Sequence, residues 1–391
     1  MIQDCEIYSD GTGFSVRGQI NHEILHQTQN ATEAIQFALD NLHNEGGEVI
    51  LHRGTYPLDE PIQLKNRVIL RGKGRGSKLS ITAANAQGVG IVCEGLKGAV
   101  ITDLALTPAK SVAGVAGIIL DSCGDCQVHD VLCQGFATYG IWVRNSSFLC
   151  EISSCQLVDN QTANLYLEDL CKGRAGDFLP NLVTDVTIYG GGVGIECNRA
   201  LVVNITECIL LHTKKYGIYV HNESNSVLIS GCRTYQIETD AVVLEESHEI
   251  NISSNIFCWH RGHGVILDGV KWGTVSANNI IDSGVRTPDK SLRNGLILKN
   301  DTRGVQVSGN AIFNWGDQTP MEWGVIEDDS CVKNIIAYNN INFFTCGGVQ
   351  SSGRESVESH NLCEGQEAWI GMNRPGYPDF SREGIESFIR E

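Results

Sequence analysis

A pattern of five residues recurs between residues 217 and 268, and this repeat limits the possible folds more than any other feature of the chain. Residues 217–221 (GIYVH) return as 241–245 (AVVLE) and again as 264–268 (GVILD). In each copy the second and fourth side chains share a face and the third points away, which is the period of a strand. Asn and Gly lie between the copies, where the chain must turn. A step of 23 or 24 residues suits one coil of short stacked strands. The pattern predicts an all-β solenoid, a right-handed parallel β-helix.

The solenoid is predicted to form a single body with a segment at either end. An irregular N-terminal arm covers residues 1–29, the β-helix covers 30–354, and a tail without the repeat covers 355–391. A solenoid grows in one dimension, so one body can use a chain of 391 residues.

A short capping helix is predicted at the start of the solenoid, over residues 30–44. Asn30 and Glu33 have the form of a capping box, in which each side chain bonds the backbone of the other residue. Such a helix would cover the first coil, whose core is otherwise open. The apolar face of the helix consists of Ala34, Ile35, Ala38, Leu39 and Leu42.

The formal net charge of −17 at pH 7 limits the classes of partner. Nucleic acids and, to a lesser degree, polyanionic glycans prefer basic surfaces, so a neutral substrate is favoured and no nucleic-acid partner is expected. The first residues lack the basic start and apolar run of a secretory signal, and no apolar window of about 18 residues could span a bilayer. We therefore expect a cytoplasmic protein with no membrane partner.

The 15 cysteines are spread along the coils and do not form a disulfide framework. This distribution favours reduced thiols that serve as small core residues. Cys123 and Cys126 have C-x-x-C spacing, but no second pair with zinc-ligand spacing follows, so no metal is expected.

The first strands of successive coils can be aligned, and their outward residues form a column of unusual composition. A solvated strand face is normally polar, yet nine of these ten residues are apolar or aromatic. Such a column is expected to be buried, either in a homotrimer around a three-fold axis or beneath the same chain after Asn361. The inward anchors of the alignment are Ile91, Ile118, Ile141, Leu165, Ile195, Ile218, Val242, Val265, Leu296 and Val325. The outward column, called the central column below, is Val92, Ile119, Trp142, Tyr166, Glu196, Tyr219, Val243, Ile266, Ile297 and Ile326.

A further column of residues at one turn of each coil changes from mostly cysteine to asparagine along the chain. Stacked asparagines at a turn can hydrogen-bond their neighbours above and below, so a structural role is predicted. The column is Cys155, Val186, Cys208, Cys232, Asn255, Asn278, Asn310 and Asn339.

Glu196 is the single carboxylate in the central column. A carboxyl group buried among apolar side chains tends to hold its proton, as a proton donor to a leaving oxygen must. Asp185 ends the preceding strand, and Glu207 occupies the same position one coil later. Because glycosidic bonds are usually broken by two carboxyl groups, Glu196, Asp185 and Glu207 are the candidate catalytic residues. Asp185 and Glu207 have a second interpretation as turn residues, since Asp103 and Asp130 share their column.

Aromatic and basic side chains at two places are candidates for contact with a sugar. One place is the central column on either side of Glu196, and the other is a crowded turn at residues 259–263. An aromatic ring can stack on a sugar ring, although core or interface packing explains a single tryptophan equally well. The candidate substrate-binding residues are Tyr166, Tyr219, His221, Trp259, His260 and Arg261.

Residues 30–90 resemble the N-terminal part of the pectate-lyase-like β-helix superfamily. The resemblance lies in the succession of helix, Gly-Gly at 46–47, strand, Gly-Thr-Tyr at 54–56, apolar strand and Leu-Arg-Gly at 70–72. It implies the fold, but not the substrate, because lyases, hydrolases, epimerases and viral tailspikes share it.

Residues 180–350 resemble the inulin fructotransferase and difructose-dianhydride hydrolase family, glycoside hydrolase family 91. There an Asp near the end of one strand and a Glu pointing outward from the next are catalytic, as Asp185 and Glu196 would be here. Members are trimers with the active site between subunits. The resemblance implies that Glu196 protonates the oxygen leaving a fructosyl carbon. Asp185 would stabilise the cationic transition state or take the proton of the attacking hydroxyl. A sugar hydroxyl would give a difructose dianhydride, water would give hydrolysis, and no cofactor is implied.

Two other function classes stay open. A pectate-lyase-like lyase or hydrolase acting on a uronate-containing glycan needs cations near the substrate carboxylate. Side chains that can supply positive charge exist, but they form no visible cluster with acidic ligands. A non-catalytic carbohydrate-binding trimer would rely on aromatic side chains alone. The positive charges in question are those of Arg144, Lys214, Lys215, His221 and Arg261.

Overall fold

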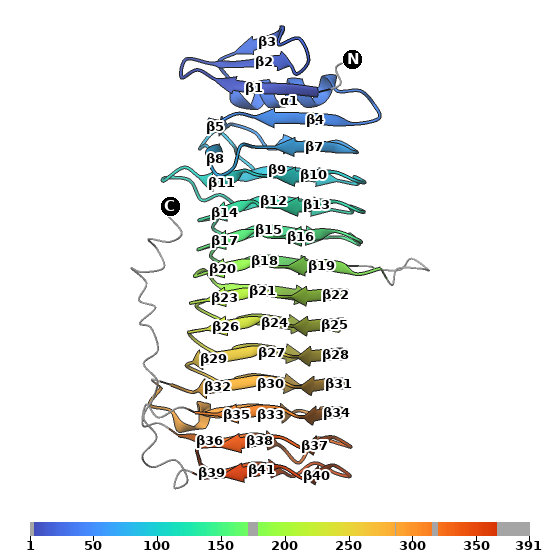
Figure 1. Cartoon of the computed structure of the whole chain (residues 1–391), viewed down its shortest axis with the longest axis vertical. Helices are drawn as coiled ribbons and strands as arrows, with labels where there is room; N and C mark the ends of the chain where they lie inside the picture. Colours follow the sequence, from blue (N-terminus) through green and yellow to red (C-terminus); the bar gives the residue numbers. More distant parts are fainter. Residues whose placement is uncertain (1–3, 171–178, 286, 315–319, 366–391) are drawn as a thin grey trace.

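The computed structural model describes residues 4–170, 179–285, 287–314 and 320–365. The chain winds into a stack of coils in which three sheets run along the length of the molecule, as Figure 1 shows. We call these sheets I, II and III, in the order in which each coil passes through them; they contain 12, 16 and 13 strands. From β4 onward all pairing within the sheets is parallel, which confirms the predicted all-β parallel architecture.

The strand bounds, sheet by sheet, are as follows. Sheet I contains β6 (Ile62–Gln63), β9 (Val89–Glu94), β12 (Ala116–Asp121), β15 (Tyr139–Arg144), β18 (Ala163–Glu168), β21 (Val193–Asn198), β24 (Ile218–His221), β27 (Val242–Glu245), β30 (Val265–Asp268), β33 (Asn294–Lys299), β36 (Met321–Glu327) and β39 (Phe344–Ser351). Sheet II contains β3 (Ile24–Thr28), β2 (Phe14–Gly18), β1 (Asp4–Ser9), β4 (Gly47–Leu51), β7 (Val68–Arg71), β10 (Val100–Thr102), β13 (Gln127–His129), β16 (Glu151–Ser153), β19 (Asn181–Thr184), β22 (Leu201–Thr206), β25 (Asn225–Ser230), β28 (His248–Ser253), β31 (Lys271–Ser276), β34 (Arg303–Ser308), β37 (Ile335–Ala337) and β40 (Val357–Ser359). Sheet III contains β5 (Gly54–Leu58), β8 (Ser77–Ile81), β11 (Ala105–Pro108), β14 (Leu132–Gln134), β17 (Gln156–Val158), β20 (Thr187–Tyr189), β23 (Ile209–Leu211), β26 (Arg233–Tyr235), β29 (Ile256–His260), β32 (Asn279–Ser283), β35 (Ala311–Phe313), β38 (Asn340–Asn342) and β41 (Leu362–Glu364).

The register of sheet I confirms the alignment made from the sequence. Ile195 pairs with Leu165 on one side and with Ile218 on the other, and the same pairing links all ten inward anchors. The anchors are buried, because parallel strands about 4.8 Å apart stack them directly on one another inside the coil.

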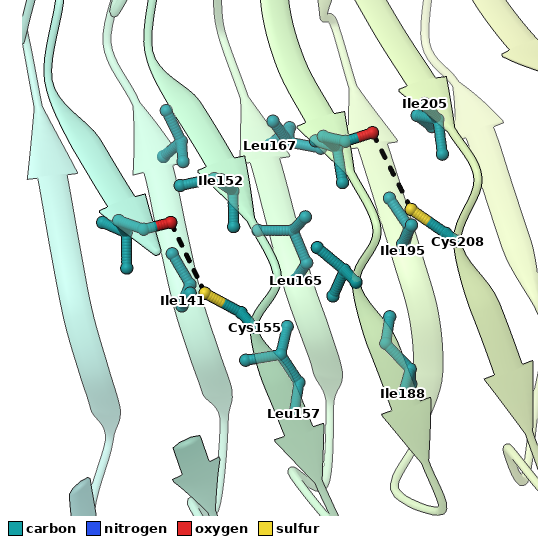
Figure 2. Close-up of a cluster of buried hydrophobic side chains, with 14 of the residues drawn as sticks. Ile141, Ile152, Cys155, Leu157, Leu165, Leu167, Ile188, Ile195, Ile205 and Cys208 are labelled. Carbon is teal, nitrogen blue, oxygen red and sulfur yellow. Dashed lines mark hydrogen bonds between the residues drawn. The ribbon is translucent and has the colours of Figure 1, made fainter. Parts of the chain in front are cut away.

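The core inside the coils is built from aliphatic side chains with thiols between them, as Figure 2 shows. The Sγ atom of Cys155 donates to the carbonyl of Val128 at 3.4 Å, and that of Cys208 to the carbonyl of Val183 at 3.7 Å. The cysteines of the described residues are free, and all except Cys346 and Cys363 are buried. They therefore act as small core residues, as their distribution predicted.

The asparagine column forms a buried ladder at the turn between sheets II and III. Oδ1 of Asn278 accepts hydrogen bonds from the backbone N–H and the side-chain amide of Asn255, at 3.0 and 2.9 Å. The same pair of bonds joins Asn278 to Asn310 and Asn310 to Asn339. Each side chain thus satisfies backbone groups of a tight turn that water cannot reach, which confirms the predicted structural role.

The first residues of the chain are more regular than the predicted arm. Strands β1, β2 and β3 pair antiparallel with one another, and β1 joins β4 in parallel, so they extend sheet II at its N-terminal edge. The alternation of Cys5, Ile7 and Val16, all buried, is a strand pattern too short to be recognised among polar neighbours.

Helix α1 (Ala31–Asn41) begins where the capping box predicted. Oδ1 of Asn30 accepts from the backbone N–H of Glu33 at 3.0 Å, and Ile35 and Leu39 are buried in the main core. The carboxylate of Glu33 bonds Thr28 and His26 instead of returning to the backbone of Asn30. The helix ends at Asn41, before the predicted residue 44; its function as a cover for the first coil stays a prediction.

At the other end, the coils continue beyond the predicted loss of the repeat at residue 355. Strand β40 extends sheet II and β41 extends sheet III, and the last member of the asparagine ladder is Asn361. A short 3₁₀ helix, η1 (Lys290–Leu292), lies in the loop after β32. The rest of the predicted tail, residues 366–391, lies outside the described residues. None of the described helices is both long and apolar enough to cross a bilayer.

Candidate functional site

The ten residues of the central column stack on one another along sheet I, as the sequence predicted. Glu196 pairs with Tyr166 on β18 and with Tyr219 on β24, and the same register joins the ten residues from Val92 to Ile326. Tyr166 and Val243 are buried within one chain, at 6% and 3% exposure. Much of the column is therefore covered without a partner, and the homotrimer stays a prediction.

A second outward column runs beside the first, two residues further along each strand. Most of its side chains are acidic. Its two cationic side chains form ion pairs with aspartates: Arg144 with Asp121 at 2.7 Å, and Lys299 with Asp268 at 3.1 Å. We call it the charged column. Its members are Glu94, Asp121, Arg144, Glu168, Asn198, His221, Glu245, Asp268 and Lys299.

The aromatic part of this face lies on either side of Glu196. On one side Tyr139 stacks on Tyr166 with ring centroids 4.6 Å apart, and Trp142 lies 4.9 Å from Tyr139. On the other side Tyr219 lies 4.9 Å from Tyr216. Glu196 thus interrupts a surface of rings.

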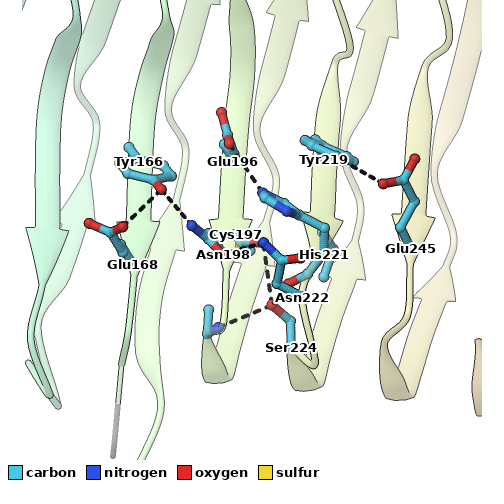
Figure 3. Close-up of polar contacts among 12 residues, drawn as sticks. Tyr166, Glu168, Glu196, Cys197, Asn198, Tyr219, His221, Asn222, Ser224 and Glu245 are labelled. Atoms are coloured by element: carbon cyan, nitrogen blue, oxygen red, sulfur yellow. Dashed lines mark hydrogen bonds and ion pairs between the residues drawn. The ribbon is translucent and has the colours of Figure 1, made fainter.

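Glu196 itself is held by His221. Nε2 of His221 lies 3.1 Å from Oε1 of Glu196, and the two side chains are only 13% and 16% exposed. The imidazole ring stacks on Tyr219 at 4.2 Å, and Tyr219 donates its hydroxyl to Glu245 at 2.5 Å. Figure 3 shows this chain of contacts across β21, β24 and β27. One oxygen of Glu196 is therefore engaged, and the ring that engages it is itself fixed by packing.

A second carboxylate, Glu168, lies on the neighbouring strand β18. Tyr166 donates its hydroxyl to Oε1 of Glu168 at 3.2 Å and accepts from the side-chain amide of Asn198 at 2.7 Å (Figure 3). Burial raises the pKa of Tyr139, and the negative charges of Glu196 and Glu168 raise it further. Both carboxylates therefore lie near the same phenol.

Glu168 was missed in the sequence analysis, although a signal was present. In Tyr166-Leu167-Glu168 the strand period of two places Glu168 on the outer face with Tyr166. Each strand of sheet I has two outward residues, and the second of them, two positions after the central column, belongs to the charged column.

Asp185 and Glu207 lie elsewhere in the coil. Asp185 follows β19 at the corner between sheets II and III, with φ +54°, and Glu207 has φ +56° at the same corner one coil later. Asp103 and Asp130 share this left-handed turn position, and Oδ2 of Asp185 accepts from Ser154 at 3.0 Å. This corner lies across the coil from the outer face of sheet I. The structure therefore does not bring either residue to Glu196 within one chain, and both are turn residues there.

The six predicted substrate-binding residues fall into three groups. Tyr166, Tyr219 and His221 surround Glu196, as described above. Trp259 and Arg261 line a hollow at the corner between sheets III and I. His260 points into the core with no exposed surface, so the prediction that it contacts substrate is wrong; in a strand, alternate side chains face opposite sides.

The burial of His260 gives a testable dependence of stability on pH. Burial lowers the pKa of His260 to about 3, and its Nε2 lies 3.2 Å from the hydroxyl of Thr234. Below pH 6.5 the unfolded chain takes up this proton while the folded chain does not. The free energy of unfolding should therefore fall with pH by about 1.4 kcal/mol per pH unit, through this group alone, between about pH 6.5 and 3. Above pH 6.5 the contribution is constant.

Urea unfolding at several pH values between 7.5 and 5 measures this contribution. His260→Gln should show a shallower loss of unfolding free energy than the unmodified protein, by about 2 kcal/mol over the range from 6.5 to 5. His43→Gln, on the surface, serves as the control and should keep the original slope. Equal slopes in all three proteins would contradict the assignment.

No group of three or more His, Cys, Asp or Glu in the part of the chain that the structure describes is arranged to hold a metal ion. The thiols of Cys123 and Cys126 are buried and donate to backbone carbonyls, to Cys93 at 3.3 Å and Leu96 at 3.7 Å. The outer face of sheet I around Glu196 carries carboxylates, an imidazole and phenols.

Comparison with known proteins gives a family and a set of similar structures. The model of the family described as "Right handed beta helix region" matches residues 116–269 and 193–364. The A-module of the mannuronan C-5 epimerase AlgE6 of Azotobacter vinelandii is 15% identical with a TM-score of 0.68, over 85% of this chain and 95% of that one. A mutant tailspike protein of E. coli bacteriophage HK620, in complex with a pentasaccharide, is 12% identical with a TM-score of 0.59, over 88% of this chain and 73% of that one. No curated protein sequence matches the chain.

Proposed function

The chain belongs to the right-handed β-helix family, and from this premise we propose that it binds a neutral glycan along the outer face of sheet I and cleaves a glycosidic bond there. One observation carries the proposal: Glu196 interrupts an aromatic surface, with a second carboxylate, Glu168, on the adjacent strand. Rings bind the faces of sugars, and two carboxyl groups are the usual means of breaking the bond between them.

The two acids lie on adjacent strands of the same face. Glu168 is offset from Glu196 by one strand and two residues, which places their Cα atoms about 8 Å apart. In the proposed mechanism Glu196 protonates the leaving oxygen. Glu168 is the second carboxyl group, which either stabilises the cationic transition state or activates the attacking hydroxyl.

The contacts of the two acids are compatible with these roles. Tyr166 donates to Glu168 at 3.2 Å, and a hydrogen bond to a carboxylate stabilises its charged form. Glu196 has one oxygen next to His221, which leaves the other for the substrate. The tautomer of His221 decides whether it donates to Glu196 or accepts from it.

The charge of the site favours a neutral glycan over a uronate. Arg144 and Lys299 are each paired with an aspartate, so Glu168, Glu196 and Glu245 dominate the field on this face. A polyanionic chain would be repelled. The named neighbours, a mannuronan epimerase and a tailspike complexed with a pentasaccharide, support action on a glycan in general.

A narrower form of the proposal keeps fructosyl transfer as in the inulin fructotransferase family. Asp185 would then have to reach Glu196 from another subunit of a homotrimer, since the two residues lie on different sides of one coil. The broader proposal does not need Asp185.

Product chromatography after incubation with a panel of glycans tests the proposal. The panel contains inulin, levan, difructose dianhydride, xylan, starch and β-glucan as neutral substrates, with polygalacturonate and alginate as anionic ones. We expect shorter saccharides from at least one neutral glycan. Difructose dianhydride from inulin would select the narrower form. Unsaturated uronates, seen by their ultraviolet absorbance, would contradict the proposal. The proposal would also be contradicted if none of the neutral glycans were cleaved.

A further inference from the structure

We propose a second glycan-binding site, in a groove at the corner where sheet III meets sheet I. Two neighbouring hollows of about 400 and 100 Å³ share His212 and Glu238 as lining residues, and we call the two together the groove. None of its lining residues belongs to the site around Glu196. The inference therefore goes beyond the proposed function and does not depend on it.

Both hollows have aromatic side chains in their lining. Trp259 lines the smaller one and stacks on Tyr235, which lies outside the lining, with ring centroids 5.4 Å apart. The indole N–H of Trp259 donates to Oδ2 of Asp282 at 2.7 Å, and Asp282 is buried. In the larger hollow Tyr189 meets His212 edge to face at 5.3 Å.

These rings are fixed before a ligand arrives. Trp259 is held on one side by the stacking on Tyr235 and at its nitrogen by the carboxylate of Asp282. A ring that is already immobile loses little conformational entropy on binding. The half-exposed face of Trp259 is thus suited to stacking on the apolar face of a sugar ring.

The polar lining of the groove has balanced charge. Arg261 bonds Glu238 at 2.9 Å, and the groove is further lined by Lys214 and Asp159. Two acids and two bases cancel, so the groove does not select for an ionic ligand. Their donors and acceptors can instead bond the hydroxyl groups of a neutral sugar. This balance distinguishes the groove from the acidic face of sheet I.

The groove is long enough for a chain of sugars. Its lining residues come from the coils of β17, β20, β23, β26, β29 and β32. Six coils, about 4.8 Å apart, span about 24 Å parallel to the axis of the stack. The ligand that fits is therefore a neutral oligosaccharide or a polysaccharide segment, and not a single sugar.

Isothermal titration with fructo-, xylo-, malto- and cello-pentaoses tests the site, with tri-galacturonate as the anionic probe. Trp259→Ala should raise the Kd of the best pentaose about tenfold, since stacking on a ring contributes about 1.4 kcal/mol at most. Trp272→Ala is the matched control: Trp272 is 60% exposed on β31 of sheet II, away from the groove. It should bind as the unmodified protein does.

Two further variants keep the test valid if Trp259→Ala fails to fold, as judged by circular dichroism. Lys214→Ala and Arg261→Ala change exposed side chains of the groove and should each raise the Kd severalfold. Unchanged binding in all groove variants would overturn the site. The site would also be overturned if none of the pentaoses bound, or if tri-galacturonate bound more tightly than the pentaoses.

Glu196→Gln separates this inference from the proposed function. It should lower the rate of product formation by at least about a hundredfold and leave the pentaose affinity of the groove unchanged. Cleavage that depends on Glu196, without any effect of Trp259→Ala on binding, would mean that the proposed function holds and the groove does not. If Trp259→Ala weakened pentaose binding but no cleavage depended on Glu196, the groove would hold and the proposed function would not.

Discussion

Glu196→Gln should lower kcat on the cleaved glycan by at least about a hundredfold, with KM nearly unchanged. A glutamine cannot donate the proton that the leaving oxygen needs, and general acid catalysis contributes about 10² to 10⁴ in rate. The amide keeps the shape of the side chain and can still bond Nε2 of His221, so the aromatic surface should be preserved. Glu168→Gln should cause a loss of similar size through the second carboxylate.

Asp185→Asn and Glu207→Gln are the matched controls for these two changes. Both residues occupy the left-handed turn between sheets II and III, across the coil from Glu196, so kcat should stay within about twofold of the unmodified value. The measurement is initial rate against substrate concentration, with product chromatography. A loss in Asp185→Asn equal to that in Glu196→Gln, with Glu168→Gln fully active, would reject the pair on sheet I. It would favour a site shared between subunits.

Asn278→Ala should lower the free energy of unfolding by about 3 kcal/mol. The change removes the acceptor of the Asn255 backbone N–H and the donor to the carbonyl of Ile252, both at 3.0 Å. Each buried polar group left without a partner costs about 1 to 3 kcal/mol. The alanine also cuts the ladder between Asn255 and Asn310, so two neighbouring turns lose support.

Asn279→Ala, one residue later, is the control. Its side chain is exposed on β32, and the free energy of unfolding should change by less than about 0.5 kcal/mol. Urea unfolding followed by circular dichroism gives both values. If the two variants lost equal stability, the ladder would not be the source of the effect.

The strand register was predictable because alternation constrains it tightly. A shift of one residue in any coil would turn inward residues such as Ile195 out to solvent and charged residues such as Glu196 into the core. The same alternation holds for all ten coils of the alignment, so each coil supports the assignment of the next. Helix α1 was predictable for a similar reason, since its capping box and its apolar face are both local patterns.

The three N-terminal strands were not predictable on these terms. Strands β1 to β3 pair in antiparallel order outside the repeat, and no neighbouring coil supports their assignment. The separation of the candidate acids Asp185 and Glu196 in space was also not predictable from the sequence. Asp185 and Glu196 are close in sequence, but the turn from sheet II to sheet III and the return to sheet I separate them.

Three properties can be predicted from the amino-acid pattern alone: the chain is a β-helix, certain residues face its core, and Glu196 stands among apolar and aromatic neighbours. These properties follow from a local period of two, repeated coil after coil. Which residues lie together on the surface depends on how the coils stack. Stacking places Glu168 on the strand beside that of Glu196, from 28 residues away, and it assembles a groove from residues between Asp159 and Val285. Contacts between coils depend on the length and angle of every intervening turn, and no local pattern of residues encodes them.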